Sequence, residues 1–184
     1  MMSFIDLYNI PFKDLSQGKV HKFEFEVNEE FFQNFDYSEY KEGQVKIVVD
    51  LVVNPNNLVL DFYLYGQVKV VCDVCLSEFF HPIKYYTTLY VKLGNFNTDW
   101  FDYDQEIVID RSEVNINIAK HIYDFINLAL PIKKVHPLDS DGKPTCDPFM
   151  LKMLEELSPG TNKENNSQSN NLDSRWDALR KLLN

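Results

Sequence analysis

Three long segments in the first half of the chain alternate apolar and polar residues, and this alternation restricts the fold more than any other feature. In QVKIVVDLVV, which follows Gly43, every second residue is apolar and falls on one face: Val45, Ile47, Val49 and Leu51. The segments 57–72 and 79–93 are equally rich in residues that favour strands. The turn NPNN and a cysteine-bearing bend connect the three segments. The pattern predicts an antiparallel meander, with Gly66 as a candidate kink in its second strand.

Shorter patterns on either side predict an α+β fold. Residues 19–27 alternate as a half-buried strand, Asn28 is suited to cap a short helix, and IVID at 107–110 indicates a short strand or an edge. From about Val114 to Ala129, apolar residues recur at helical spacing and Pro131 ends the pattern: Ile118, Ile122, Phe125, Ile126 and Ala129. We expect a curved antiparallel sheet packed by one main helix. The pattern does not decide whether the sheet closes in a barrel-like form.

The C-terminal part of the chain divides into a linker and a second helix. Residues 159–171 hold no apolar side chain and five asparagines, which is typical of a flexible segment. The sequence that follows places four apolar residues on one helical face: Leu172, Trp176, Leu179 and Leu183. We therefore expect a domain at 1–157, a polar linker at 158–171 and an amphipathic helix at 172–184.

This terminal helix is too short to be stable alone in water, so its apolar stripe must be buried against something. Arg175 and Arg180 flank the stripe, so the face formed with Trp176 and Leu179 is a candidate for binding a protein or RNA. Docking of the same face onto its own domain is the alternative.

The overall charge limits the classes of partner. A formal net charge of −10 argues against binding nucleic acid by bulk charge, because phosphate contacts need clustered Lys and Arg. Any RNA contact has to come from a local cluster of basic residues, whereas a basic protein partner suits the negative electrostatic field of the whole protein. The N-terminus lacks the features of a signal peptide, and no apolar run approaches the length of a membrane span. We expect a soluble cytoplasmic protein without a membrane partner.

Cys72 and Cys75 have the spacing with which metal sites take two ligands from one turn. The other half of a zinc site has to come from His136 and Cys146, which have nine residues between them, if this loop folds back. Cys72, Cys75, His136 and Cys146 would then form a three-Cys, one-His set. In the alternative interpretation, the pair consists of small buried residues at a strand turn and Cys146 is unrelated. A redox pair is a third interpretation, but redox pairs usually begin a helix and this pair lies between strands.

Motifs of catalysis are sparse. The chain has no glycine-rich phosphate loop, no G-x-S-x-G elbow and no H-E-x-x-H helix. DSDGK at 139–143 resembles the start of a calcium loop, but its glycine comes too early and no glutamate stands at the twelfth position, so a turn is expected. These observations favour a protein that is not an enzyme.

The motifs taken in order resemble the YceD-like family, also called the large ribosomal RNA subunit accumulation protein family. The similarity covers about 45–184 and rests on a C-x-x-C-L turn, an LALP segment after a helix, a cysteine-bearing loop and a final R-W-x-A-L-x-x-L. The sequence departs from the family in two places. Val74 replaces a basic residue that is common between the cysteines, and Cys146 stands where many members have a second close cysteine pair.

This resemblance implies a non-enzymatic role in the accumulation or processing of large-subunit ribosomal RNA, in a bacterium or an organelle of bacterial origin. The implied partners are precursor large-subunit rRNA and basic ribosomal proteins. The alternative is a zinc-stapled interaction module that holds a basic protein client through its acidic surface, without RNA contact.

Overall fold

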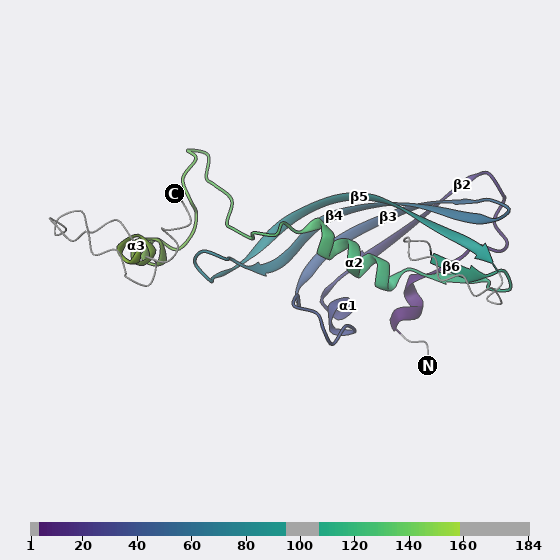
Figure 1. The fold of residues 1–184 in the computed structure, drawn as a ribbon, viewed down its shortest axis with the longest axis horizontal. Coiled ribbons are helices and arrows are strands. Elements are labelled where there is room, and N and C mark those ends of the chain that lie inside the picture. Colours follow the sequence, from purple (N-terminus) through teal and green to yellow (C-terminus); the bar gives the residue numbers. More distant parts are fainter. Residues whose placement is uncertain (1–3, 95–106, 159–184) are drawn as a thin grey trace, which may run out of the picture.

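The computed structural model describes residues 4–94 and 107–158, and these form a long curved sheet with helices on one side (Figure 1). The predicted helix at 172–184, with Arg175, Trp176, Leu179 and Arg180, lies outside the described residues, as does most of the predicted linker. The sheet has five strands in the order β2-β3-β4-β5-β6. Their bounds are β2 (Val20–Val27), β3 (Gly43–Val53), β4 (Asn57–Val71), β5 (Glu78–Gly94) and β6 (Ile107–Asp110).

β3, β4 and β5 form the predicted antiparallel meander, and β2 extends it by pairing antiparallel with β3. β3 pairs with β2 and β4, and β4 pairs with β5 from Asn57↔Lys92 to Val71↔Glu78. β6 differs, because it lies parallel to β5, with Val91 opposite Ile107. The described sheet stays open and does not close into a barrel. The fold class is therefore α+β with a mostly antiparallel sheet, as predicted.

Alternation along the strands decides which face is buried, as the sequence predicts. On β3 the buried residues are Val45, Ile47, Val49, Leu51 and Val53, and on β4 they include Leu58, Leu60, Phe62 and Leu64. Because successive side chains of a strand point to opposite faces, all of these lie on the same side of the sheet. The other side carries the polar and tyrosine residues of the same strands.

Gly66 is needed for a close approach between strands. β4 runs through this residue without interruption, and Gly66 lies opposite Val45 on β3. A Cβ atom at this position would collide with the backbone oxygen of Gln44 and lie 2.7 Å from the Cα of Val45. Only glycine fits at this position, because the backbone of β3 lies too close for any side chain.

The main helix, α2 (Ala119–Ala129), covers the buried face of the sheet and corrects one prediction. Helical spacing predicted a start near Val114, but residues Asn115–Asn117 form a short strand, β7, that pairs with β1 (Asn9–Pro11). Two strands that are more than 100 residues apart satisfy each other's backbone groups here, which local helical spacing cannot reveal. The Asn117 side chain then accepts a hydrogen bond from the amide of Ala119 at 3.1 Å and helps to begin the helix.

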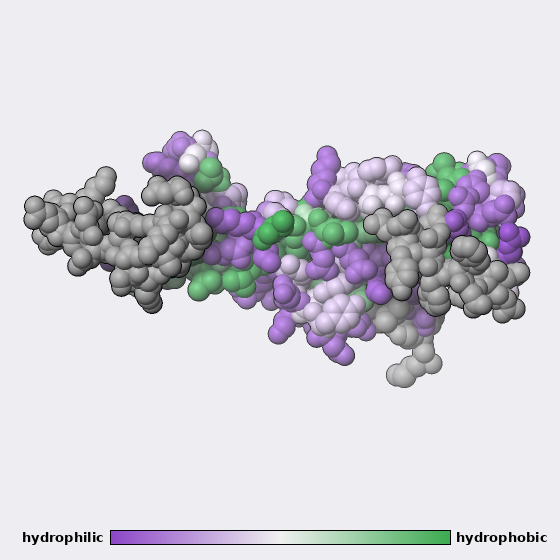
Figure 2. Space-filling model, viewed as in Figure 1, coloured by the Kyte–Doolittle hydropathy of each residue, from purple (hydrophilic) through white to green (hydrophobic). Residues whose placement is uncertain are grey.

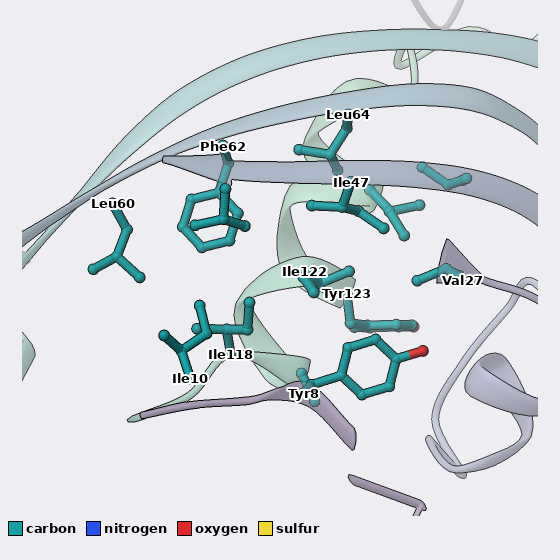
Figure 3. Packing of buried hydrophobic residues seen from close by; sticks show 14 of the residues in the cluster. Tyr8, Ile10, Val27, Ile47, Leu60, Phe62, Leu64, Ile118, Ile122 and Tyr123 are labelled. Atoms are coloured by element: carbon teal, nitrogen blue, oxygen red, sulfur yellow. The ribbon is translucent and has the colours of Figure 1, made fainter. Parts of the chain in front are cut away.

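The N-terminal elements complete the cover of the core. They are the 3-10 helix η1 (Phe4–Tyr8) and the short helix α1 (Glu29–Gln33), whose predicted cap Asn28 accepts from the amide of Phe31 at 3.3 Å. Figure 3 shows Tyr8, Ile122 and Tyr123 directed towards Ile47 and Leu64 of the sheet. Phe62 contacts Phe125 of α2 with ring centroids 5.0 Å apart. The core thus lies between the sheet and a layer made of α2 and the N-terminal segment.

A helix that the sequence analysis did not identify, α3 (Pro148–Leu157), follows the last cysteine. Asp147 caps it by accepting a hydrogen bond from the amide of Phe149 at 2.8 Å, and Pro148 occupies its first position. An aspartate followed by proline is the signal that could have predicted this start. DSDGK forms the predicted turn, with Gly142 at a φ of 76°. No helix within residues 4–94 and 107–158 has the length and apolar character needed to cross a membrane.

Candidate metal centre

The cysteine pair lies at the far end of the β4–β5 hairpin, away from the main core (Figure 1). β4 ends at Val71, and the turn that follows is closed by two backbone hydrogen bonds. The Cys72 amide donates to the Ser77 carbonyl at 2.9 Å, and the Leu76 amide donates to the Cys72 carbonyl at 3.0 Å. Leu76 has a φ of 60°, a left-handed conformation that is costly for a residue with a side chain. Leu76 lies in the bend between Cys75 and the start of β5 at Glu78.

The segment after α2 brings His136 and Cys146 to this turn. The amide of Asp73 donates to the carbonyl of Lys134 at 2.8 Å, and the amide of Lys134 donates to the Asp73 carboxylate at 2.6 Å. The loop between His136 and Cys146 then folds back on itself, with a bridge between Leu138 and Pro144. The wide spacing of the two residues in sequence is therefore no obstacle to a shared site.

Cys72, Cys75, His136 and Cys146 form one cluster, in which one ligand atom from each residue lies within 4.8 Å of all the others. The Sγ atoms of Cys72 and Cys146 are 3.7 Å apart. His136 Nδ1 lies 3.5 Å from the Sγ of Cys75 and 3.7 Å from that of Cys146. The interpretation in which Cys146 is unrelated to the pair is wrong, because Cys146 is part of the same cluster.

These separations match the edges of a zinc tetrahedron. Zinc bonds of about 2.3 Å to sulfur and 2.0–2.1 Å to nitrogen place two sulfurs about 3.8 Å apart, and a sulfur and a nitrogen about 3.6 Å apart. The donor set, three thiols and one imidazole, is also one that zinc accepts. The residues present therefore fit a metal of this type.

Further contacts hold the four side chains in place. The Val74 amide donates to the Cys72 sulfur at 3.4 Å, and the Ser77 hydroxyl lies 3.1 Å from the Cys75 sulfur. The imidazole of His136 stacks on Phe79 with ring centroids 4.2 Å apart. Sequence reasoning missed Ser77 and Phe79. Ser77, two residues after Cys75, could have been found from its spacing, but the stacking of Phe79 depends on tertiary structure.

The thiols differ in their pKa values. Burial alone raises the pKa of the Cys72 thiol, but hydrogen bonds from the backbone amides of Cys75, Val74 and His136 outweigh it and lower the pKa to about 7. The hydroxyl of Ser77 lowers the pKa of the Cys75 thiol. Burial raises the pKa of the Cys146 thiol to about 11, and the neighbouring sulfurs of Cys72 and Cys75 add to the rise. Three thiolates so close together repel one another, and a bound cation removes this repulsion.

The cluster suits a structural centre. Four protein ligands complete the coordination of a zinc ion and leave no position for a substrate or an activated water. The residues also join two parts of the chain, the hairpin end and the segment before α3. Around them the surface is apolar: Figure 2 shows hydrophobic residues at this end of the hairpin, where Val71, Leu76 and Phe80 are exposed.

Comparison with known proteins supplies the family. Neither a curated protein nor a solved structure matches the chain. A family model does match, over residues 60–183, a range that begins in β4 and includes all four residues of the cluster. Because the match covers more than half of the sequence, the chain belongs to the family described as large ribosomal RNA subunit accumulation protein YceD.

Proposed function

We propose that this protein is a non-catalytic factor in the accumulation of large-subunit ribosomal RNA, and that it binds precursor rRNA or pre-ribosomal particles. The observation that carries the proposal is the family match, which includes the hairpin end, the cluster and the C-terminal segment in one unit. The absence of an open metal position at the cluster is consistent with a binding role.

Within this proposal the cluster holds a zinc ion through Cys72, Cys75, His136 and Cys146. The ion supplies cross-linking between the hairpin end and the segment that carries His136 and Cys146. Such a link fixes the apolar surface around Leu76 and Phe80 in one conformation. A rigid surface loses less conformational entropy when a partner binds to it.

The C-terminal segment is the second proposed contact. Trp176 and Leu179 would anchor it in an apolar site, with Arg175 and Arg180 at the rim, where guanidinium groups bind phosphate or carboxylate. Co-sedimentation with large-subunit precursors in sucrose gradients tests this idea. We expect Trp176→Ala and Arg175→Ala proteins to leave the precursor fractions. Ser174→Ala, on the predicted polar side of the same helix, is the matched control and should co-sediment normally. Anchoring by this segment is wrong if all three variants behave like the unmodified protein.

The net charge of −10 favours a second candidate function, a zinc-stapled module that holds a basic ribosomal protein without touching RNA. Treatment with ribonuclease separates the two functions. An association that persists after RNA digestion and follows one basic protein supports the second candidate. An association that is lost on digestion supports RNA binding.

A further inference from the structure

The outward face of the sheet carries a group of tyrosines between two lysines. Two neighbouring rows cross β3, β4 and β5 on this face. One row is Lys46, Tyr65 and Lys84, and the next is Val48, Tyr63 and Tyr86. We call Tyr63, Tyr65, Tyr86, Lys46 and Lys84 the tyrosine face.

None of the described helices covers the tyrosine face. The contact between α2 and the sheet is made by Phe62 and its neighbours on the opposite side, and Figure 1 shows α1 and α2 on that same side. Tyr65 keeps 45% and Tyr86 57% of their surface exposed to solvent. Large aromatic side chains that gather on an open surface usually mark a site of interaction.

Pairing across the strands explains only part of this arrangement. Tyr63 and Tyr86 are direct neighbours with ring centroids 5.0 Å apart, a contact that stabilises a sheet. Tyr65 has no tyrosine opposite it, and instead the Nζ of Lys84 lies 5.9 Å from the centre of its ring. Tyr65 and Tyr86 both remain largely exposed, so a further flat group can reach them from the solvent.

Charges of both signs surround these rings, so an aromatic ligand has to be held mainly by stacking, with the lysines as local contacts for phosphate. Lys46 and Lys84 lie on either side of Tyr65, about one strand spacing away. Lys46 lies opposite Glu26 of β2, and its Nζ is 3.9 Å from a carboxylate oxygen of Glu24. The side chains of Lys46 and Glu24 are both more than half exposed, so water screens this pair. Asp50 and Asp61 lie side by side in the next row of the same face, and Asp61 accepts hydrogen bonds from the hydroxyls of Tyr86 at 3.2 Å and Thr88 at 2.6 Å. Phosphates can therefore approach the lysines while bases contact the rings.

We propose that the tyrosine face binds single-stranded RNA. Bases stack on Tyr65 and on the Tyr63–Tyr86 pair, and Lys46 and Lys84 contact the phosphates between them. Sheets that present aromatic side chains bind unpaired bases in this way, whereas a base-paired helix keeps its bases stacked on one another and unable to lie on the rings. That the RNA is ribosomal rests on the proposed function. The binding itself does not.

The acidic character of the protein gives the proposal a distinctive signature. With only two lysines in contact with phosphates, the logarithm of the affinity should fall with the logarithm of the salt concentration with a slope of only about −1.4. Binding that depends on bulk charge has a much steeper slope. Stacking, rather than counterion release, should supply most of the affinity.

The test measures fluorescence anisotropy of fluorescein-labelled single-stranded oligonucleotides with the full chain. Tyr65→Ala/Tyr86→Ala should weaken binding at least about 30-fold, whereas Tyr65→Phe/Tyr86→Phe, which keeps both rings, should stay within about threefold of the unmodified protein. Tyr90→Ala is the matched control, because Tyr90 is 58% exposed on the same strand and lies four residues from Tyr86. It should change the affinity less than twofold. Thermal melting of each variant shows whether the sheet is intact.

Three results of these binding measurements would overturn the proposal. Equal affinity of the double alanine variant, equal binding of duplex RNA, or a steep salt slope would each show that the tyrosine face is not an RNA platform. If the unmodified protein binds no RNA but the double alanine variant loses a basic ribosomal protein, the face is a protein contact. Co-sedimentation of the unmodified protein with large-subunit precursors tests the proposed function separately. If it co-sediments while the tyrosine variants bind RNA normally, only the inference fails, and if it does not, the proposed function fails whatever the oligonucleotides show.

Discussion

Replacing Cys146 with serine tests the metal centre most directly. Cys146 is the only cysteine of the cluster that comes from outside the hairpin turn, and its sulfur lies 3.7 Å from that of Cys72. Structural zinc sites with four ligands bind with about 10–16 kcal/mol, so the loss of one thiolate should cost about 3 kcal/mol. This corresponds to a zinc affinity about 100-fold lower. Zinc content measured by mass spectrometry after competition with a chelator gives this number.

The same substitution should release one part of the chain and leave the rest folded. α3 has no buried residue, and only Met150 and Leu151 pack against the cluster. The buried residues of the core between the sheet and α2 are distinct from the three buried cysteines, although Phe79 packs against both groups. We therefore expect amide hydrogen exchange to rise throughout residues 134–158, while the amides of β3 and β4 stay protected.

Ser140→Ala is the control for this experiment, because Ser140 is an exposed residue of the loop that joins His136 to Cys146. It should keep both zinc and protection. Removal of zinc from the unmodified protein by a chelator should reproduce the exchange pattern of Cys146→Ser. The reasoning is refuted if Cys146→Ser keeps a full equivalent of zinc, or if residues 134–158 stay protected in the metal-free protein.

Three further predictions concern the same structure. Gly66→Ala should lower the free energy of unfolding by about 3 kcal/mol or more, measured by urea denaturation, because the new methyl group forces β3 away from β4 and breaks about two hydrogen bonds of the ladder. Gly18→Ala is the control, because Gly18 has a φ of 70° but open space around it, and it should lower the free energy of unfolding by only about 1 kcal/mol. Equal losses of stability in the two variants would contradict the close approach at Gly66. Leu76→Gly should be about 1 kcal/mol more stable than Leu76→Ala in thermal melts of the zinc-loaded protein, because only glycine adopts a φ of 60° without strain, and no difference would show that this backbone is relaxed. Above pH 7, zinc affinity should rise by at least about tenfold per pH unit, because the Cys146 thiol, with its pKa of about 11, must lose a proton to bind the metal. Below pH 7 the rise should be steeper, because Cys72, with a pKa of about 7, is then protonated too. Titration with a zinc indicator at several pH values measures this slope, and a flat profile would exclude thiolate ligation.

The sequence determined the elements whose signals are local. The alternation of apolar and polar residues along a strand is visible in the sequence, so the buried face of β3 and the antiparallel order of β3 to β5 could be predicted. Asn28 and the Phe residues after it predicted α1, because a cap and its helix are neighbours in the chain. The C-x-x-C turn indicated a ligand pair for the same reason. The candidate partners of that pair, His136 and Cys146, could be named from their chemistry, although their proximity could not be shown.

Tertiary structure decided everything that depends on segments distant in sequence. Asn115–Asn117 form a strand because Asn9–Pro11 lie beside them, and this pairing overrides the helical spacing that begins at Val114. β6 lies parallel to β5, which alternation along one strand cannot specify. His136 reaches Cys75 because the backbone of Lys134 forms hydrogen bonds with both the amide and the carboxylate of Asp73, a contact between residues 61 positions apart. Local propensity records only what a residue does with its near neighbours, whereas a metal cluster and an open sheet face arise where separate segments satisfy each other's hydrogen bonds and bury each other's apolar surface.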